Sequence, residues 1–149
     1  MALLVIGAGL MLWKMSRRDE LRELRREIIT GDAKGLDELL TQHPSLANAK
    51  DVDRTRGWQP LHAAAYMGSP EIIKVLLAHH ANTEARDKRG LTPLLWTAFV
   101  GKPDAAAALL SGGADINAKG RDGRTTLDQA KISMNQELIT LLRERGAKE

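Results

Sequence analysis

The chain has 149 residues, which is enough for one domain with a continuous hydrophobic core. Hydrophobic residues make up 43% and charged residues 28%, which excludes an intrinsically disordered chain. It has no cysteine, so disulfides, thiolate-ligated zinc and thiol catalysis are excluded, and its formal net charge is +3.

An uncharged, mostly apolar run occupies residues 2–13 and is followed by Lys14, Arg17 and Arg18. As a helix it would be ~18 Å long, against ~30 Å for the hydrocarbon core of a bilayer. A secretory signal requires basic residues before its apolar run, and none precede this one. Trp13 beside Lys14 is typical of an interfacial anchor. We predict a membrane anchor over residues 1–15, with the following domain on the cytoplasmic side. A helix packed on that domain, an uncleaved signal-like end, and a soluble cytoplasmic or exported protein stay open.

Residues 16–30 are predicted to form a helix, because Leu21, Leu24 and Ile28 fall at i, i+3 and i+7. The many charged residues around this stripe indicate a solvated face with ion pairs. Beside an anchor, they could also contact anionic headgroups. The stripe leads into a degenerate first unit, in which residues 31–40 align with 68–77, and the extra residues fall in a loop at 41–56.

A period of 33 residues organises the rest of the chain. Three residue types recur at this spacing: Gly57, Gly90 and Gly123; Leu61, Leu94 and Leu127; Ala81, Ala114 and Ala147. A fixed period of this size indicates a solenoid, in which each unit buries its apolar face only by stacking on its neighbours.

Residues 59–64, Gln-Pro-Leu-His-Ala-Ala, resemble the Thr-Pro-Leu-His-x-Ala core of the ankyrin repeat, and Thr92-Pro93-Leu94 keeps its first three residues. Residues 112–118 resemble the family's Gly-Ala-Asp-x-Asn-Ala ending. The resemblance implies an all-α solenoid over residues 16–149, with about four helix-turn-helix repeats and short turn or β-hairpin tips. The repeats would lie at about 24–50, 54–86, 87–119 and 120–149. It also implies that His62 hydrogen-bonds the backbone of the neighbouring repeat.

Local signals within the repeats agree with this reading. Thr92 is predicted to cap a helix that begins at Pro93 and ends at Gly101, and a second helix is predicted over about 104–110. His80 occupies the position that Gly113 holds one repeat later, so we expect a strained helix exit there, at a cost on the order of 1 kcal/mol.

The resemblance also implies that partners meet the concave face, made of the turn tips and the first helix of each repeat. The predicted partner-binding residues are Arg56, Trp58, Tyr66, Met67, Lys88, Arg89, Leu91, Phe99, Val100, Arg121 and Arg124. Aromatic and Met side chains bounded by Arg and Lys are typical of a protein-binding patch. Burial of some of them by the 41–56 loop or the N-terminal helix stays open, and Trp96 is predicted to lie in the core.

No catalytic, cofactor-binding or metal-binding residues are predicted. His79 and His80 are adjacent rather than at i, i+4, and no strand precedes the Gly112-Gly113 pair. We therefore predict a non-enzymatic adaptor that binds a protein partner. An acidic surface on that partner would suit the basic tips, and we do not expect small-molecule binding. The alternative is electrostatic binding of acidic lipid or nucleic acid by the basic tips, although nucleic acid is the weaker candidate.

Overall fold

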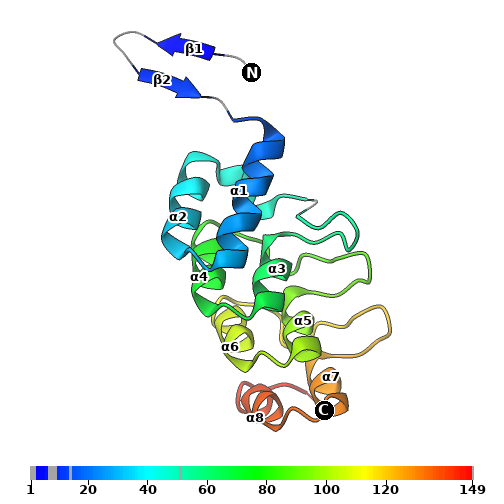
Figure 1. The fold of residues 1–149 in the computed structure, drawn as a ribbon. Helices are drawn as coiled ribbons and strands as arrows, with labels where there is room; N and C mark the ends of the chain where they lie inside the picture. Colours follow the sequence, from blue (N-terminus) through cyan, green and yellow to red (C-terminus); the bar gives the residue numbers. More distant parts are fainter. Residues whose placement is uncertain (1–2, 7–9, 14, 51, 149) are drawn as a thin grey trace.

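The computed structural model describes residues 3–6, 10–13, 15–50 and 52–148, the first two segments as backbone. Its described part contains eight α-helices in four stacked pairs and one short 3-10 helix (Figure 1). The pairs are α1 (Arg17–Thr30) with α2 (Ala33–Gln42), α3 (Pro60–Met67) with α4 (Pro70–Ala78), α5 (Pro93–Val100) with α6 (Pro103–Ser111), and α7 (Thr126–Ile132) with α8 (Gln136–Glu144). The 3-10 helix, η1 (Pro44–Asn48), follows α2.

The helices form two parallel rows. We call α1, α3, α5 and α7 the inner helices, and α2, α4, α6 and α8 the outer helices. Each inner helix packs on the next inner helix, each outer helix on the next outer helix, and the two helices of a pair on each other. The prediction of an all-α solenoid is therefore confirmed.

Proline and capping side chains set the helix ends. Four α-helices begin with a proline, namely α3, α4, α5 and α6, and so does η1. The Thr92 hydroxyl accepts a hydrogen bond from the Leu95 N–H at 3.3 Å, and Gly101, at φ 69°, ends α5, as the sequence predicts. The exit of α4 is strained as expected, because His80 has a φ of 60°, whereas glycine occupies the equivalent Gly113 and Gly146.

The core lies between the two rows and repeats with the sequence period. Leu61, Leu94 and Leu127, at one inward position, are each 1% exposed. Leu24 and Ile28 of α1 are also buried, so the predicted stripe faces the first interface, with Leu21 at its margin. Burying each such side chain stabilises the fold by roughly 1.5–3 kcal/mol.

Turns at both ends of the helix pairs tie neighbouring repeats together. At the tips, the Lys88 N–H donates to the Arg56 carbonyl at 2.9 Å. On the other side, the Asn48 side chain accepts from the Asn82 N–H at 2.7 Å, and the Glu84 carboxylate accepts from the Asp115 N–H at 2.9 Å. These bonds satisfy backbone groups of the turns, which have no partner within a helix.

The N-terminal run is not helical where the structure describes it. β1 (Leu3–Ile6) and β2 (Leu10–Trp13) pair antiparallel, with Leu3 opposite Trp13, and the hairpin projects beyond α1 (Figure 1). The described residues of the run therefore do not form the helix whose length we compared with the bilayer; two glycines within the run, each costing about 1 kcal/mol in a helix, oppose a helix. Residues 1–2 and 7–9 of the predicted anchor, and Lys14, lie outside the described residues. Across the part that is described, none of the helices has the length and apolar character needed to span a bilayer.

Candidate protein-binding face

Four of the five aromatic residues of the chain gather in one cluster near the tips. Trp58 precedes α3, Tyr66 lies in α3, and Trp96 and Phe99 lie in α5. The Trp58 ring centroid is 5.1 Å from that of Tyr66 and 5.0 Å from that of Trp96. Trp96 also lies 5.9 Å from Tyr66 and 5.8 Å from Phe99. This aromatic cluster therefore bridges two adjacent repeats, with Trp96 at its centre.

A buried carboxylate fixes Trp96. Asp87 Oδ2 accepts a hydrogen bond from Trp96 Nε1 at 2.8 Å, and Asp87 itself is 5% exposed. Its other oxygen accepts from the Arg89 N–H at 2.8 Å and the Leu91 N–H at 2.9 Å. Asp87 thus connects the tip of its repeat to the aromatic cluster.

The preceding tip is held by Asp53. One oxygen of Asp53 accepts from the Thr55 hydroxyl at 2.6 Å, and also from the backbone N–H groups of Thr55 and Arg56. The Thr55 hydroxyl is the main reason that the pKa of Asp53 lies below its ordinary value. Asp53 is therefore ionised at neutral pH, and it also pairs with the Arg56 guanidinium at 3.1 Å.

Two exposed arginines, one from each tip, cover the cluster. The Arg56 guanidinium carbon lies 4.7 Å from the Trp58 ring centroid and 5.8 Å from that of Tyr66. The Arg89 guanidinium carbon lies 5.7 Å from Trp96 and 5.1 Å from Phe99. Both arrangements have cation–π geometry. The Arg56 guanidinium also pairs with Asp53, and both exposed guanidinium groups keep further N–H donors that can bind carboxylates of a partner.

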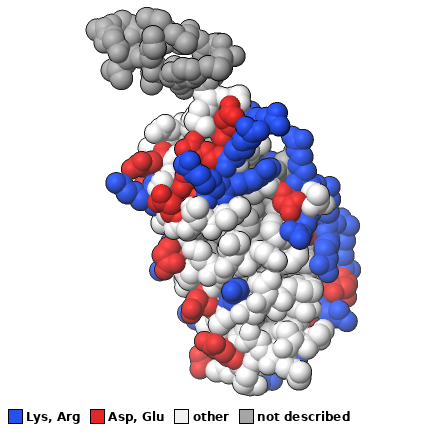
Figure 2. Space-filling model, in the orientation of Figure 1, with Lys and Arg blue, Asp and Glu red and all other residues white. Residues whose placement is uncertain are grey.

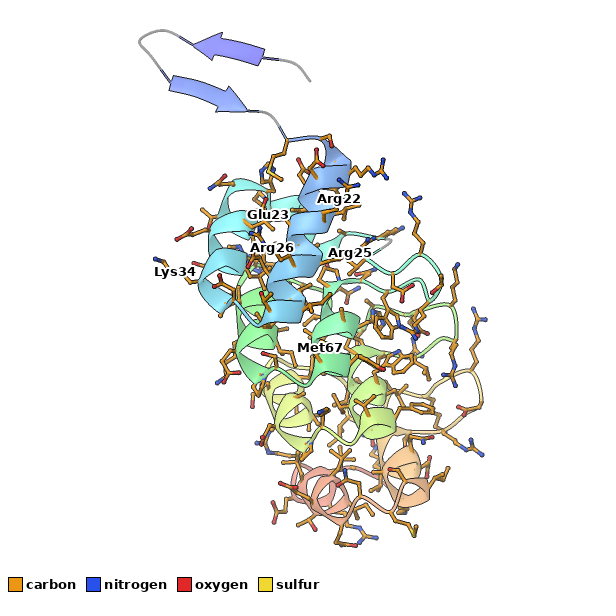
Figure 3. All side chains as sticks on the ribbon, in the orientation of Figure 1. Arg22, Glu23, Arg25, Arg26, Lys34 and Met67 are labelled. Atoms are coloured by element: carbon orange, nitrogen blue, oxygen red, sulfur yellow. The ribbon has the colours of Figure 1, made fainter. Side chains whose placement is uncertain are left out.

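An apolar groove of about 210 Å³ opens between α1, α3 and the first tip. Its lining residues are Arg25, Ile28, Ile29, Val52, Asp53, Trp58, Ala63, Tyr66 and Met67. Tyr66 is 40% exposed, Met67 42% and Ile29 63%, although all three are large apolar side chains. Figure 3 shows Met67 at the carboxyl end of α3, beside α1. The groove is large enough to receive an apolar side chain from a partner.

Charge is distributed unevenly over the surface. Figure 2 shows Lys and Arg gathered over α1 and along the tips, whereas Asp and Glu lie mainly on the side of the outer helices. The basic side is therefore the side that carries the aromatic cluster and the apolar groove.

A comparison with family models agrees with this geometry. The model described as ankyrin repeats (3 copies) matches residues 28–120. The chain belongs to the ankyrin repeat family. Ankyrin repeats imply a protein-binding domain, which is typically a non-enzymatic binding module. The pair α7 and α8 extends the ankyrin stack beyond the matched residues. No curated protein matches the chain.

The ankyrin histidine has the structural role that the resemblance implied. His62 is fully buried, its Nε2 lies 3.1 Å from the Leu91 carbonyl of the next repeat, and its Nδ1 accepts from the Gln59 N–H at 3.1 Å. Nε2 must therefore carry the proton and donate it to Leu91. Burial lowers the pKa of His62, so the ring is neutral at physiological pH.

Two of the predicted partner-binding residues are corrected by the ankyrin structure. Trp58 is 5% exposed and Leu91 is 4% exposed, so neither offers its side chain to a partner. Trp58 is covered because its ring packs between Tyr66 and Trp96, while Leu91 packs towards Gly120 of the next tip. Trp96 is buried, as predicted.

The remaining predicted residues reach the surface to different degrees. Phe99 and Val100 are half-buried against the core, and the others are exposed: Arg56, Tyr66, Met67, Lys88, Arg89, Arg121 and Arg124. Sequence reasoning missed Ile29 and Asp87. The sequence already shows that Ile29 is apolar and lies outside the α1 stripe, so its exposure could have been predicted. The burial of Asp87 could not, because it depends on the contact with Trp96.

Proposed function

We propose that this ankyrin domain is an adaptor that captures a protein partner on its concave face and is held at a membrane by residues 2–13. One observation carries the first part: Tyr66 and Met67 are exposed beside an apolar groove and next to the arginine-covered aromatic cluster. Aromatic anchors that enter a groove contribute most of the affinity of an interface, while charges at its edge steer the encounter.

The experiment is capture of proteins from detergent-solubilised membranes by the intact chain. We expect Tyr66→Ala with Met67→Ala to abolish capture of the protein that the wild type enriches. The matched control, Glu71→Ala with Lys74→Ala, changes exposed residues on the outer helix α4 and should capture normally. Circular dichroism should show that both variants are folded at the assay temperature, with a lower melting temperature for the Tyr66/Met67 variant because Tyr66 packs on Trp58. Undiminished capture by the Tyr66/Met67 variant would overturn the proposal.

The second part, the tether, rests on the uncharged composition of residues 2–13 and on the Trp13 that ends them. A four-residue strand reaches only ~13 Å, and an open hairpin leaves backbone groups without partners in lipid. We therefore propose that the segment lies in the membrane interface, with the basic residues after it and the repeats on the cytoplasmic side.

Removing residues 2–13 should move the chain from the membrane pellet to the soluble fraction. The helical circular dichroism signal should persist, since α1 begins at Arg17. A shortened chain that stays in the pellet would refute the tether. If nucleic acid rather than protein binds the tips, affinity should fall steeply with salt, which a titration of a duplex at two salt concentrations would detect.

A further inference from the structure

A second groove, of about 650 Å³, lies where α1 faces the first tip. Its described lining is Leu21 and five arginines, namely Arg17, Arg18, Arg22, Arg25 and Arg54. Arg18, Arg22 and Arg25 are spaced i, i+4 and i+7, which places them on one face of α1. Arg54 comes from the tip across from them, about thirty residues further along the chain. We call this feature the arginine groove.

Positive charge in the arginine groove is only partly neutralised. Arg17 pairs with Glu20 at 3.1 Å and Arg22 with Asp19 at 3.4 Å, both near the start of α1. Arg18 and Arg54 form no ion pair within the described part of the chain. In Figure 3, Arg22 and Arg25 lie on the tip side of α1, whereas Glu23 lies on the α2 side.

Such clustering of like charges needs a reason. Guanidinium groups gathered around one groove repel each other, and none of the described lining residues is acidic. A bound anion with several oxygens removes this repulsion and accepts paired hydrogen bonds from the planar guanidinium groups, as phosphate does.

The position of the groove identifies the source of the phosphate. Arg17 follows Trp13 by four residues, which span at most ~14 Å. This maximum is about one and a half Debye lengths, which are roughly 8–10 Å each in physiological salt, so a link that is not fully extended brings Arg17 within the range of attraction to the membrane surface.

We propose that the arginine groove binds the phosphate headgroup of anionic phospholipids. This proposal rests on the tether in that the N-terminal segment would hold the groove at headgroup depth. Juxtamembrane basic clusters are attracted to anionic leaflets, and their attraction falls off over about one Debye length.

Vesicle co-sedimentation of the full chain tests the proposal. The vesicles are pure phosphatidylcholine, and phosphatidylcholine with one fifth phosphatidylserine or a few per cent phosphatidylinositol bisphosphate. We expect the wild type to bind anionic vesicles at least tenfold more tightly than neutral ones. Replacing Arg18, Arg22 and Arg54 by glutamine should remove this difference and leave neutral binding unchanged. The matched control replaces three exposed cations of the third tip by glutamine: Lys119, Arg121 and Arg124. It should keep most of the difference.

The groove and the tether can fail separately. Equal binding of the wild type to neutral and anionic vesicles would overturn the groove and leave the tether standing. If the chain lacking residues 2–13 binds neutral vesicles as the full chain does, the tether is wrong, and anionic binding that still requires the three arginines supports the groove. Arginine-dependent binding of soluble inositol phosphate without any vesicle binding would overturn the lipid assignment. So would an equal loss of anionic binding in both glutamine variants, since net charge alone would then explain it.

Discussion

Replacement of Asp87 by asparagine should destabilise the repeat stack through a single contact. The side-chain oxygen must stay near the Arg89 and Leu91 N–H groups, 2.8 and 2.9 Å away, because both need an acceptor. The new amide NH₂ then takes the place of Oδ2, which in the wild type accepts from Trp96 Nε1–H at 2.8 Å. In the variant, two donors face each other and the indole N–H has no acceptor. Losing a hydrogen bond to a charged group costs about 1.5–3 kcal/mol, and leaving a buried donor unsatisfied costs about 1–3 kcal/mol. Since the two costs overlap, we expect a loss of about 2–4 kcal/mol.

The assay is urea unfolding followed by circular dichroism at the helical band, with linear extrapolation to water. Trp96→Phe removes the indole donor, so Asp87→Asn should cost less in the Trp96→Phe background than alone. A double-mutant cycle measures this coupling directly. Asp122→Asn is the control, because Asp122 is exposed and accepts from the Arg124 N–H at 3.1 Å. A loss below about 0.5 kcal/mol for Asp87→Asn, or strict additivity in the cycle, would refute the reasoning.

Three further predictions concern the core, acid sensitivity and the strained turn. Leu94→Ala should lower the free energy of unfolding by ~2–5 kcal/mol in urea melts, and so should Leu61→Ala; negligible losses at both would mean that these residues do not face the core. The pKa of His62 is lowered by burial, so the unfolded chain takes up a proton before the folded one. The contribution of neutral His62 to the free energy of unfolding should therefore be fully present above about pH 6.5 and be lost as the pH falls below it. The free energy of unfolding of His62→Gln, measured over the same pH range, should not show that part of the decline. His80→Gly should raise the melting temperature by relieving a φ of 60°, worth up to about 1 kcal/mol, and a lower melting temperature would mean that contacts of His80 matter more.

Much of the fold follows from the sequence because the repeat period specifies which residues face inward. Leu94 and Leu127 share a position with Leu61, and all three are buried as the period predicts. Helix ends were equally predictable, since Thr92 and Gly101 act through neighbouring backbone groups.

Features that depend on contacts between repeats were not predictable in this way. Trp58 occupies a tip position, yet its burial depends on Trp96, which is 38 residues away. Likewise the arginine groove exists only because folding brings Arg54 opposite α1. The N-terminal run was ambiguous for a different reason: a short apolar run shows no periodicity that separates a strand from a helix.

The packing of each helix on its immediate neighbours has a mechanical consequence. Because no distant segment clamps the stack within its described part, tension applied between its two ends meets the repeat interfaces in series. A repeat that yields at one end releases 33 residues, or about 110–120 Å of extended chain, while the rest of the stack keeps its contacts. Under load the domain would therefore lengthen in discrete steps, one repeat interface at a time.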